Sequence, residues 1–147
     1  MTTLIMHRLT LSQANALIEA AFAKGAELAL KPLTVTIHDP GGHLIACQRQ
    51  DGASNMRVKL AGGKACGALA LGLSSRAIGK MAEERPHFVA AVDTMSEGGM
   101  VPAAGGVIVC DAAGTIVGAI GVTGDTSDND EACALAAIES LGLTAKG

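Results

Sequence analysis

Two segments in which β-branched and apolar residues flank a glycine-containing turn constrain the fold of this chain most strongly. The first runs from residue 33 to 49 and turns at Asp39 to Gly42, and the second runs from 106 to 123 and turns at Asp111 to Gly114. Aspartate, proline and glycine favour tight turns between neighbouring antiparallel strands. Each segment therefore predicts a β-hairpin, and no pattern in the chain predicts a doubly wound parallel sheet.

The remaining segments predict helices packed on that sheet. Helical periodicity predicts helices over residues 11–30, 53–73, 75–84 and 127–141. Three glycines in the second helix cost about 1 kcal/mol each relative to alanine, and they are tolerated where a helix packs flush against a sheet or another subunit. Residues 87–104 predict a long loop, which in a compact domain is more often functional than idle. The pattern predicts one α+β domain over residues 1–147, in two or three layers.

The composition excludes several classes of partner. The chain has no Trp, no Tyr and only two Phe, and its net charge is −3, so it lacks both the stacking platform and the basic stripe of a nucleic-acid-binding protein. No segment has transmembrane length, and residues 1–9 lack the pattern of a secretory signal. Four cysteines without a CxxC pair predict buried free thiols rather than a zinc site or disulfides. We expect a cytoplasmic protein with neither nucleic acid nor membrane as partner.

Polar side chains at the two ends of the first hairpin are the first candidates for chemistry. His38 and His43 flank its turn, and neutral imidazole is a common iron ligand and acid–base group. The alternative is that His38 simply lies on one face of a strand and that His43 is an exposed turn residue. Arg49 and Asp51 follow the returning strand, where the guanidinium is suited to clamp a carboxylate and the aspartate to act as base or ligand. An internal Arg–Asp pair that stabilises the turn is the alternative.

Candidates in the rest of the chain each have an ordinary explanation as well. Lys64 lies in an Ala/Gly-rich helix, where a buried lysine is functional or paired and an exposed one is unremarkable. Gly105 and Gly106 let the backbone approach a ligand closely, although no nucleotide-binding motif follows. Glu131 is a candidate ligand, and the dipole of the last helix explains it equally well. No catalytic motif stands by itself.

Taken in order, these segments resemble the GlcG/HbpS family of haem-binding and haem-degrading-like domains, which also occur at the C-terminus of PduO-type proteins. The resemblance extends from Leu9 to about Leu141. The matching pieces are Val35 to Leu44, Arg49 to Ala53, Lys64-Ala65, Gly105 to Val107, Gly118 to Gly124 and Asp130-Glu131. Each piece alone is weak, whereas their order is specific.

Four positions depart from the family pattern. Gln50 replaces the usual Met, Ile108 stands where Pro is common, and Thr123 replaces Ser. His38 occupies a strand position that is usually apolar, where a polar side chain is costly without a partner. This departure indicates a site of its own in this member, and a reaction rather than haem storage is one interpretation.

The resemblance implies an antiparallel five-stranded sheet flanked by helices, a profilin-like layered domain, and a homo-oligomer of dimers or higher. It further implies a small-ligand pocket near a subunit interface, walled by the Arg-x-Asp-Gly and Gly-Gly loops. The first expectation is therefore binding of haem or a related tetrapyrrole. In that case Arg49 or Lys64 holds a carboxylate, His38 or His43 approaches the iron, and Gly105 and Gly106 line the pocket.

A second expectation belongs to a different class of protein. It is a cofactor-independent enzyme, of isomerase or lyase/hydrolase type, that acts on a small carboxylated metabolite. His38 would be the acid–base group, Asp51 or Glu131 would orient it, and Arg49 would anchor the substrate. A third expectation, a structural or regulatory subunit, is favoured if the pocket is closed and apolar.

Overall fold

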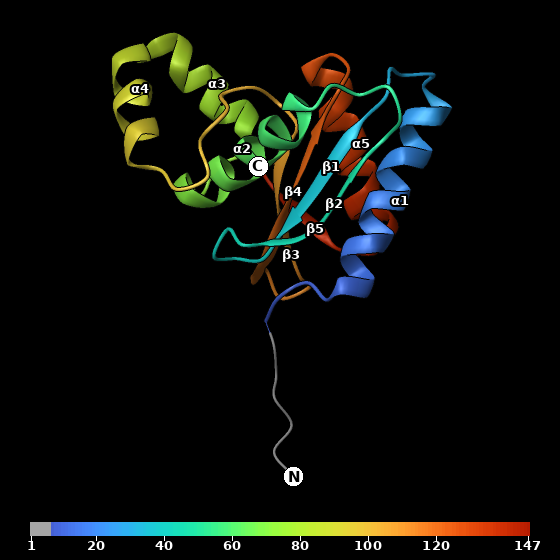
Figure 1. Ribbon diagram of the computed structural model, residues 1–147. Helices are drawn as coiled ribbons and strands as arrows, with labels where there is room; N and C mark the ends of the chain where they lie inside the picture. Colours follow the sequence, from blue (N-terminus) through green and yellow to red (C-terminus); the bar gives the residue numbers. More distant parts are fainter. Residues whose placement is uncertain (1–6) are drawn as a thin grey trace.

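The strands and helices follow the predicted order, with one helix and one strand more than the sequence pattern indicates. The computed structural model describes residues 7–147, so part of the N-terminal segment considered above lies outside the described residues. The elements are α1 Leu11–Glu27, β1 Thr34–His38, β2 Leu44–Arg49, α2 Met56–Leu71, α3 Ser75–Glu84, α4 Pro86–Met95, β3 Gly106–Cys110, β4 Ile116–Thr123, α5 Ser127–Ser140 and β5 Thr144–Lys146 (Figure 1).

The strands form one antiparallel sheet in the order β2-β1-β4-β3-β5. This confirms the expected α+β fold with a five-stranded antiparallel sheet. Both hairpins are present, and β1 and β4 are joined in the centre with Thr34 opposite Thr123. The short β5, which the sequence pattern did not indicate, adds to β3 at the edge.

The two hairpin turns are held in the same way by an aspartate side chain. The Oδ1 atom of Asp39 accepts hydrogen bonds from the backbone N–H of Gly41 and of His43, and Asp111 does the same in the second turn. Gly42 has a φ of 85°, a left-handed conformation that glycine adopts without strain. The turns predicted from Asp, Pro and Gly are therefore confirmed.

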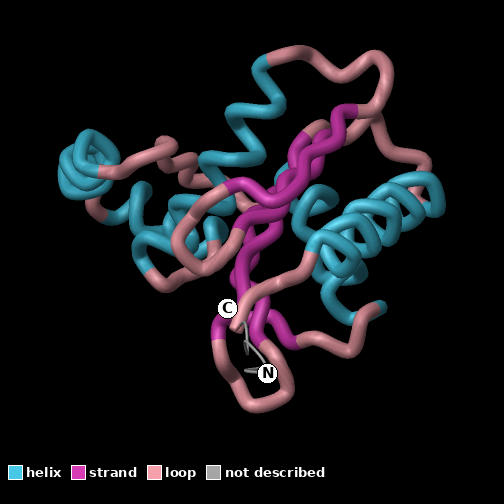
Figure 2. The backbone as a smooth tube through the Cα atoms, turned by 60° about the horizontal axis from the view of Figure 1, so that its bottom comes forward, coloured by secondary structure: helices cyan, strands magenta, loops and turns pink. Residues whose placement is uncertain are grey.

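One face of the sheet carries the larger hydrophobic core, beneath α1 and α5. Figure 2 shows the sheet between helices on its two sides. The sheet residues of this core include Val35, Ile37, Val107, Val109, Ile120 and Val122, and the helices supply Leu17, Ile18, Ala137 and Ile138. Alternation along each strand sends these side chains to one face. The helix α1 begins with a capping box between Thr10 and Gln13.

On the opposite face, α2 lies so close to the sheet that two strand positions admit only glycine. A Cβ atom built on Gly121 would lie 2.0 Å from the carbonyl oxygen of Ala61, and one built on Gly106 would lie 2.2 Å from that of Lys64. The glycines that make this contact belong to the strands, whereas those inside α2 face elsewhere. Gly63 and Gly67 contact Val101 and Met100 respectively, and a Cβ on Gly62 would meet nothing within 4 Å.

The segment expected to be a long loop, residues 87–104, begins instead with the helix α4. Pro86 is the first residue of that helix, where the fixed φ of proline is favourable and its missing N–H is not needed. Pro86 therefore both follows the end of the predicted helix over residues 75–84 and begins a further one. The loop proper is residues 96–105, and α3 and α4 form a pair that stands away from the sheet (Figure 1). Among residues 7–147, no helix is long and apolar enough to cross a membrane.

Candidate functional site

A largely apolar hollow of about 650 Å³ opens between the first hairpin, α2 and the loop that follows α4. Its lining comprises His38, Gly42, Leu44, Val58, Lys59, Leu60, Gly62, Gly63, Cys66, Gly98, Gly99 and Val101. A second hollow of about 320 Å³ shares Gly42, Cys66 and Gly98 with it. Concave apolar surface with a few convergent polar groups is the usual form of a small-molecule site. The polar groups of the hollow lie near these three shared residues.

His38 is the most buried of the polar groups at this hollow, with 5% of its surface exposed. Its Nδ1 atom lies 3.1 Å from the carbonyl oxygen of Gly42, and its Nε2 atom lies 3.0 Å from the hydroxyl of Thr36. Because a carbonyl only accepts, Nδ1 carries the proton and Nε2 accepts from the Thr36 hydroxyl. Burial lowers the pKa of His38 below 6.5. The imidazole is therefore neutral near pH 7, and both of its nitrogens have partners.

Cys66 brings a thiol to the same carbonyl group. Its Sγ atom lies 3.4 Å from the oxygen of Gly42 and 3.6 Å from Nδ1 of His38. Burial raises the pKa of the Cys66 thiol above 9.0, so the group is protonated at neutral pH. Gly98 covers the sulfur closely, since a Cβ there would lie 3.5 Å from Sγ.

Sequence reasoning placed Cys66 only among the buried thiols and missed this arrangement. Cys66 and His38 are 28 residues apart, and they meet because α2 packs across β1. No local motif encodes such a contact. The nearest indication in the sequence was the unusual histidine at a strand position that calls for a partner.

The structure places Arg49 and Asp51 at the other end of the first hairpin. In the sheet Thr34 pairs with Arg49, whereas His38 pairs with Leu44. Arg49 and Asp51 line a separate, open hollow of about 560 Å³ with Phe22, Leu30, Pro32, Gln48 and Gln50. Within residues 7–147, no ion pair joins the two side chains. They lie together, away from the two histidines.

His43 is the exposed residue of the turn, and 83% of its side chain is accessible. Its Nδ1 atom lies 3.4 Å from Oδ1 of Asp39, and the ring lines the smaller of the two joined hollows. The hairpin therefore brings the two histidines near one another but in different surroundings, one buried and one in solvent.

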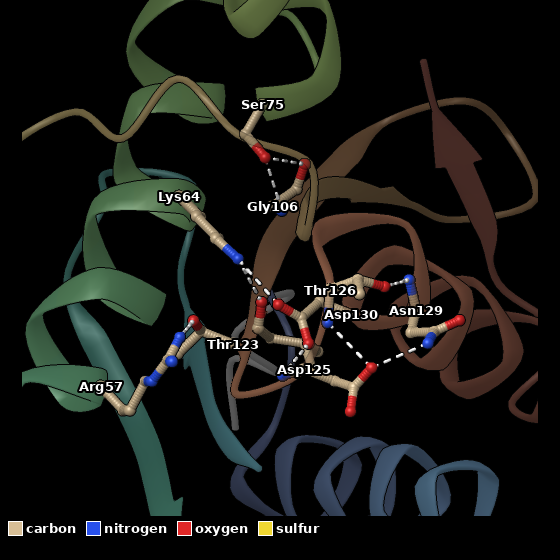
Figure 3. Close-up of polar contacts among 10 residues, drawn as sticks. Arg57, Lys64, Ser75, Gly106, Thr123, Asp125, Thr126, Asn129 and Asp130 are labelled. Atoms are coloured by element: carbon tan, nitrogen blue, oxygen red, sulfur yellow. Dashed lines mark hydrogen bonds and ion pairs between the residues drawn. The ribbon is translucent and has the colours of Figure 1, made fainter. Parts of the chain in front are cut away.

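Lys64 is inside the protein, where it forms an ion pair with Asp130 (Figure 3). Its Nζ atom lies 3.1 Å from Oδ2 of Asp130 and 3.1 Å from the carbonyl oxygen of Val122, and 5% and 1% of the two charged side chains are exposed. Loss of water around the ammonium lowers the pKa of Lys64, and Asp130 opposes that effect. Gly105 packs over this pair, since a Cβ there would lie 2.9 Å from Nζ.

Glu131 lies on the outer side of α5 and pairs with Arg76 of α3. The Nε atom of Arg76 donates to both carboxylate oxygens of Glu131, at 2.9 and 3.0 Å, and its Nη2 atom donates to Asp128. Of the candidates, the structure thus brings Lys64 together with Gly105 and Gly106, and it brings Arg49 together with Asp51. Neither group, nor Glu131, lies in the hollow that contains His38.

The fold is an α+β domain with one antiparallel sheet, and the apolar hollow opens beside its first hairpin. A family described as haem degrading protein HbpS-like matches residues 9–139. The chain belongs to this HbpS-like family, as the ordered motifs predicted. No curated protein matches it.

Several solved structures share the fold. A PduOC–haem complex superposes with a TM-score of 0.83 at 21% identity, over 95% of this chain and 99% of the other. The Klebsiella pneumoniae protein ORFY superposes with a TM-score of 0.82 at 22% identity, over 96% of this chain and 94% of the other. A double mutant of Streptomyces reticuli HbpS superposes with a TM-score of 0.78 at 26% identity, over 97% of this chain and 91% of the other.

Proposed function

We propose that this protein binds haem or a related tetrapyrrole in the hollow beside His38. The observation that carries the proposal is the convergence of an imidazole and a thiol at the inner end of an apolar hollow. Membership of the HbpS-like family and the likeness to a PduOC–haem complex support the same ligand.

The residues of the hollow fit a flat, largely apolar macrocycle. Leu44, Val58, Leu60 and Val101 supply apolar walls, and a Cβ atom on Gly62 or Gly99 would meet nothing within 4 Å. The volume of about 650 Å³ lies inside the usual range of small-molecule sites. Lys59, at the rim, is the cation available to a propionate, while His38 and Cys66 offer nitrogen and sulfur inside.

Bound there, haem supplies a redox-active iron in apolar surroundings. The chain's own residues exclude water from the inner end, pair with a propionate at the rim, and hold the proton of His38 at Nδ1 on the carbonyl of Gly42. Arg49, an expected carboxylate clamp, lies at the other end of the hairpin, so in this proposal it is not part of the pocket.

Haem titration followed in the Soret region tests the proposal. Gly62→Phe is the diagnostic variant, because Gly62 lines the hollow and a Cβ atom there meets nothing within 4 Å. Arg49→Ala is the matched control outside the hollow. We expect saturable binding in the wild type and in Arg49→Ala, and loss of at least tenfold in affinity in Gly62→Phe. Equal binding by all three proteins would place the ligand elsewhere and overturn the proposal.

The enzyme alternative has less support in the described residues. Asp51 lies at the far end of the hairpin and Glu131 is paired with Arg76, so neither carboxylate orients His38. Turnover of a small carboxylated metabolite that is lost in His38→Gln but retained in Gly62→Phe would favour it over tetrapyrrole binding.

We further propose a cytoplasmic homo-oligomer with the hollow near a subunit interface. Apolar side chains stand exposed around the hollow and on α4, among them Leu44 (58%), Met56 (55%) and Met95 (75%), which is the surface expected of a subunit contact. All four cysteines are free thiols, which fits a reducing compartment. Light scattering after size-exclusion chromatography tests the oligomer, and a monomeric mass would exclude it.

A further inference from the structure

We infer that Cys66 is the residue that ligates the iron of the bound tetrapyrrole, and that His38 serves that sulfur as a hydrogen-bond donor. The inference rests on the proposed function and assigns roles inside the same hollow. It differs from the sequence-based expectation that a histidine approaches the iron directly.

The bonds of His38 argue against the imidazole as the ligand. An imidazole ligates iron through a nitrogen that carries no proton, and in this tautomer that nitrogen is Nε2. Nε2 lies 3.0 Å from the hydroxyl of Thr36, a side chain of which only 1% is exposed. Nδ1 is held at the carbonyl of Gly42. Ligation by Nε2 would break a buried hydrogen bond and leave the Thr36 hydroxyl unsatisfied, and ligation by Nδ1 would break the bond to the carbonyl of Gly42.

Of the two candidate iron ligands, Cys66 loses the weaker hydrogen bond when it binds the metal. A thiol is a weak hydrogen-bond donor, and its contact to Gly42 is long, at 3.4 Å. The carbonyl of Gly42 keeps its bond from His38 when the thiol turns away. Cys66 also lines both joined hollows.

Ligation of the iron by Cys66 needs no further reactant to balance its atoms and electrons. One iron–sulfur bond forms, the S–H bond breaks, and the thiol proton leaves to solvent, with no change of oxidation state. The Sγ atom of the thiol lies 3.6 Å from Nδ1 of His38, so a thiolate held at that distance would share the imidazole N–H with the carbonyl of Gly42. A hydrogen bond to a ligating sulfur withdraws electron density and raises the reduction potential of the iron.

The test is spectroscopic. The ferrous carbonyl complex of a thiolate-ligated haem has a Soret band at distinctly longer wavelength than that of an imidazole-ligated one. We expect the long-wavelength band in the wild type and in Cys47→Ser, a half-buried thiol outside the hollow, and its loss in Cys66→Ser with haem still bound. In His38→Gln we expect the thiolate band to remain while the reduction potential falls.

Each contrary result overturns one part of the proposal. A wild-type spectrum of the imidazole type, or a thiolate band that survives in Cys66→Ser, overturns the role of Cys66. An unchanged potential in His38→Gln overturns the role of His38. Absence of any Soret band in the wild type overturns the proposed function itself. Should Cys66→Ser fail to fold, alkylation of the wild type with iodoacetamide decides the matter, because haem must then protect Cys66 at least tenfold while leaving the rate at Cys47 unchanged.

Discussion

The ion pair between Lys64 and Asp130 gives the sharpest test of how the two layers of this fold are joined. Asp130→Asn removes the carboxylate charge and keeps nearly the same shape. The Oδ1 atom of Asp130 also accepts the backbone N–H of Asp125 at 2.9 Å, and the amide oxygen of asparagine retains that bond. The substitution removes the charge opposite the buried ammonium, and because the amide NH2 then stands at the position of Oδ2, Lys64 also loses that hydrogen-bond acceptor.

The magnitude follows from the burial of the two side chains, of which 5% and 1% are exposed. Removing one partner of a buried pair leaves an uncompensated charge and costs about 3–5 kcal/mol. Lys64 keeps its bond to the carbonyl oxygen of Val122 at 3.1 Å, so we expect about 3 kcal/mol, the lower end. The double variant Lys64→Met/Asp130→Asn removes both charges and should recover all but about 1 kcal/mol.

Urea unfolding followed by far-ultraviolet circular dichroism measures these differences. The wild type, Lys64→Met, Asp130→Asn and the double variant form a double-mutant cycle. A loss below about 1 kcal/mol in Asp130→Asn, or a double variant no more stable than the single one, would refute the reasoning. Haem titration of the double variant adds a second readout. Unchanged affinity would mark Lys64 as a residue of the fold rather than of the ligand site.

Three further outcomes are expected. Gly121→Ala puts a Cβ 2.0 Å from the carbonyl oxygen of Ala61 and should cost about 3 kcal/mol. Gly62→Ala, with nothing within 4 Å, should add up to about 1 kcal/mol; similar urea midpoints would contradict both. Because burial lowers the pKa of His38 below 6.5, the unfolded chain binds more protons just below that pH, so stability should fall as the pH drops through this range. Unfolding at several pH values should show this slope in the wild type and not in His38→Gln. The pKa of Asp125 is lowered from 3.8 to about 2, chiefly by the hydrogen bond from the Asn129 side chain, so its stabilising contribution should be lost between those values, and Asp125→Asn should flatten acid unfolding there.

Local chemistry was sufficient to predict most elements of this fold from the sequence. Aspartate and glycine define the two turns, and the bond between Thr10 and Gln13 defines the start of α1. The helix α4 was missed because proline both ends one helix and begins the next. The strand β5 was missed because three residues carry too little pattern.

The long-range contacts of the candidate residues could not be predicted from local patterns in the sequence. Lys64 and Asp130 are 66 residues apart, and their pairing depends on how α2 and α5 meet β4. The sequence did indicate that a buried lysine or a strand histidine needs a partner. It did not indicate which partner, because that depends on the packing of layers rather than on neighbours along the chain.

The close seating of α2 on Gly106 and Gly121 has a consequence for how a ligand is received. Backbone meets backbone at this seam, so the helix cannot move toward the sheet, and the wall of the hollow that it forms is rigid before any ligand arrives. The opposite wall is made by Gly98 and Gly99, whose φ values are 83° and 82° and whose surface is exposed. Adjustment to the proposed ligand is then confined to a few residues on one side of the hollow. The conformational entropy that the protein loses on binding is correspondingly small.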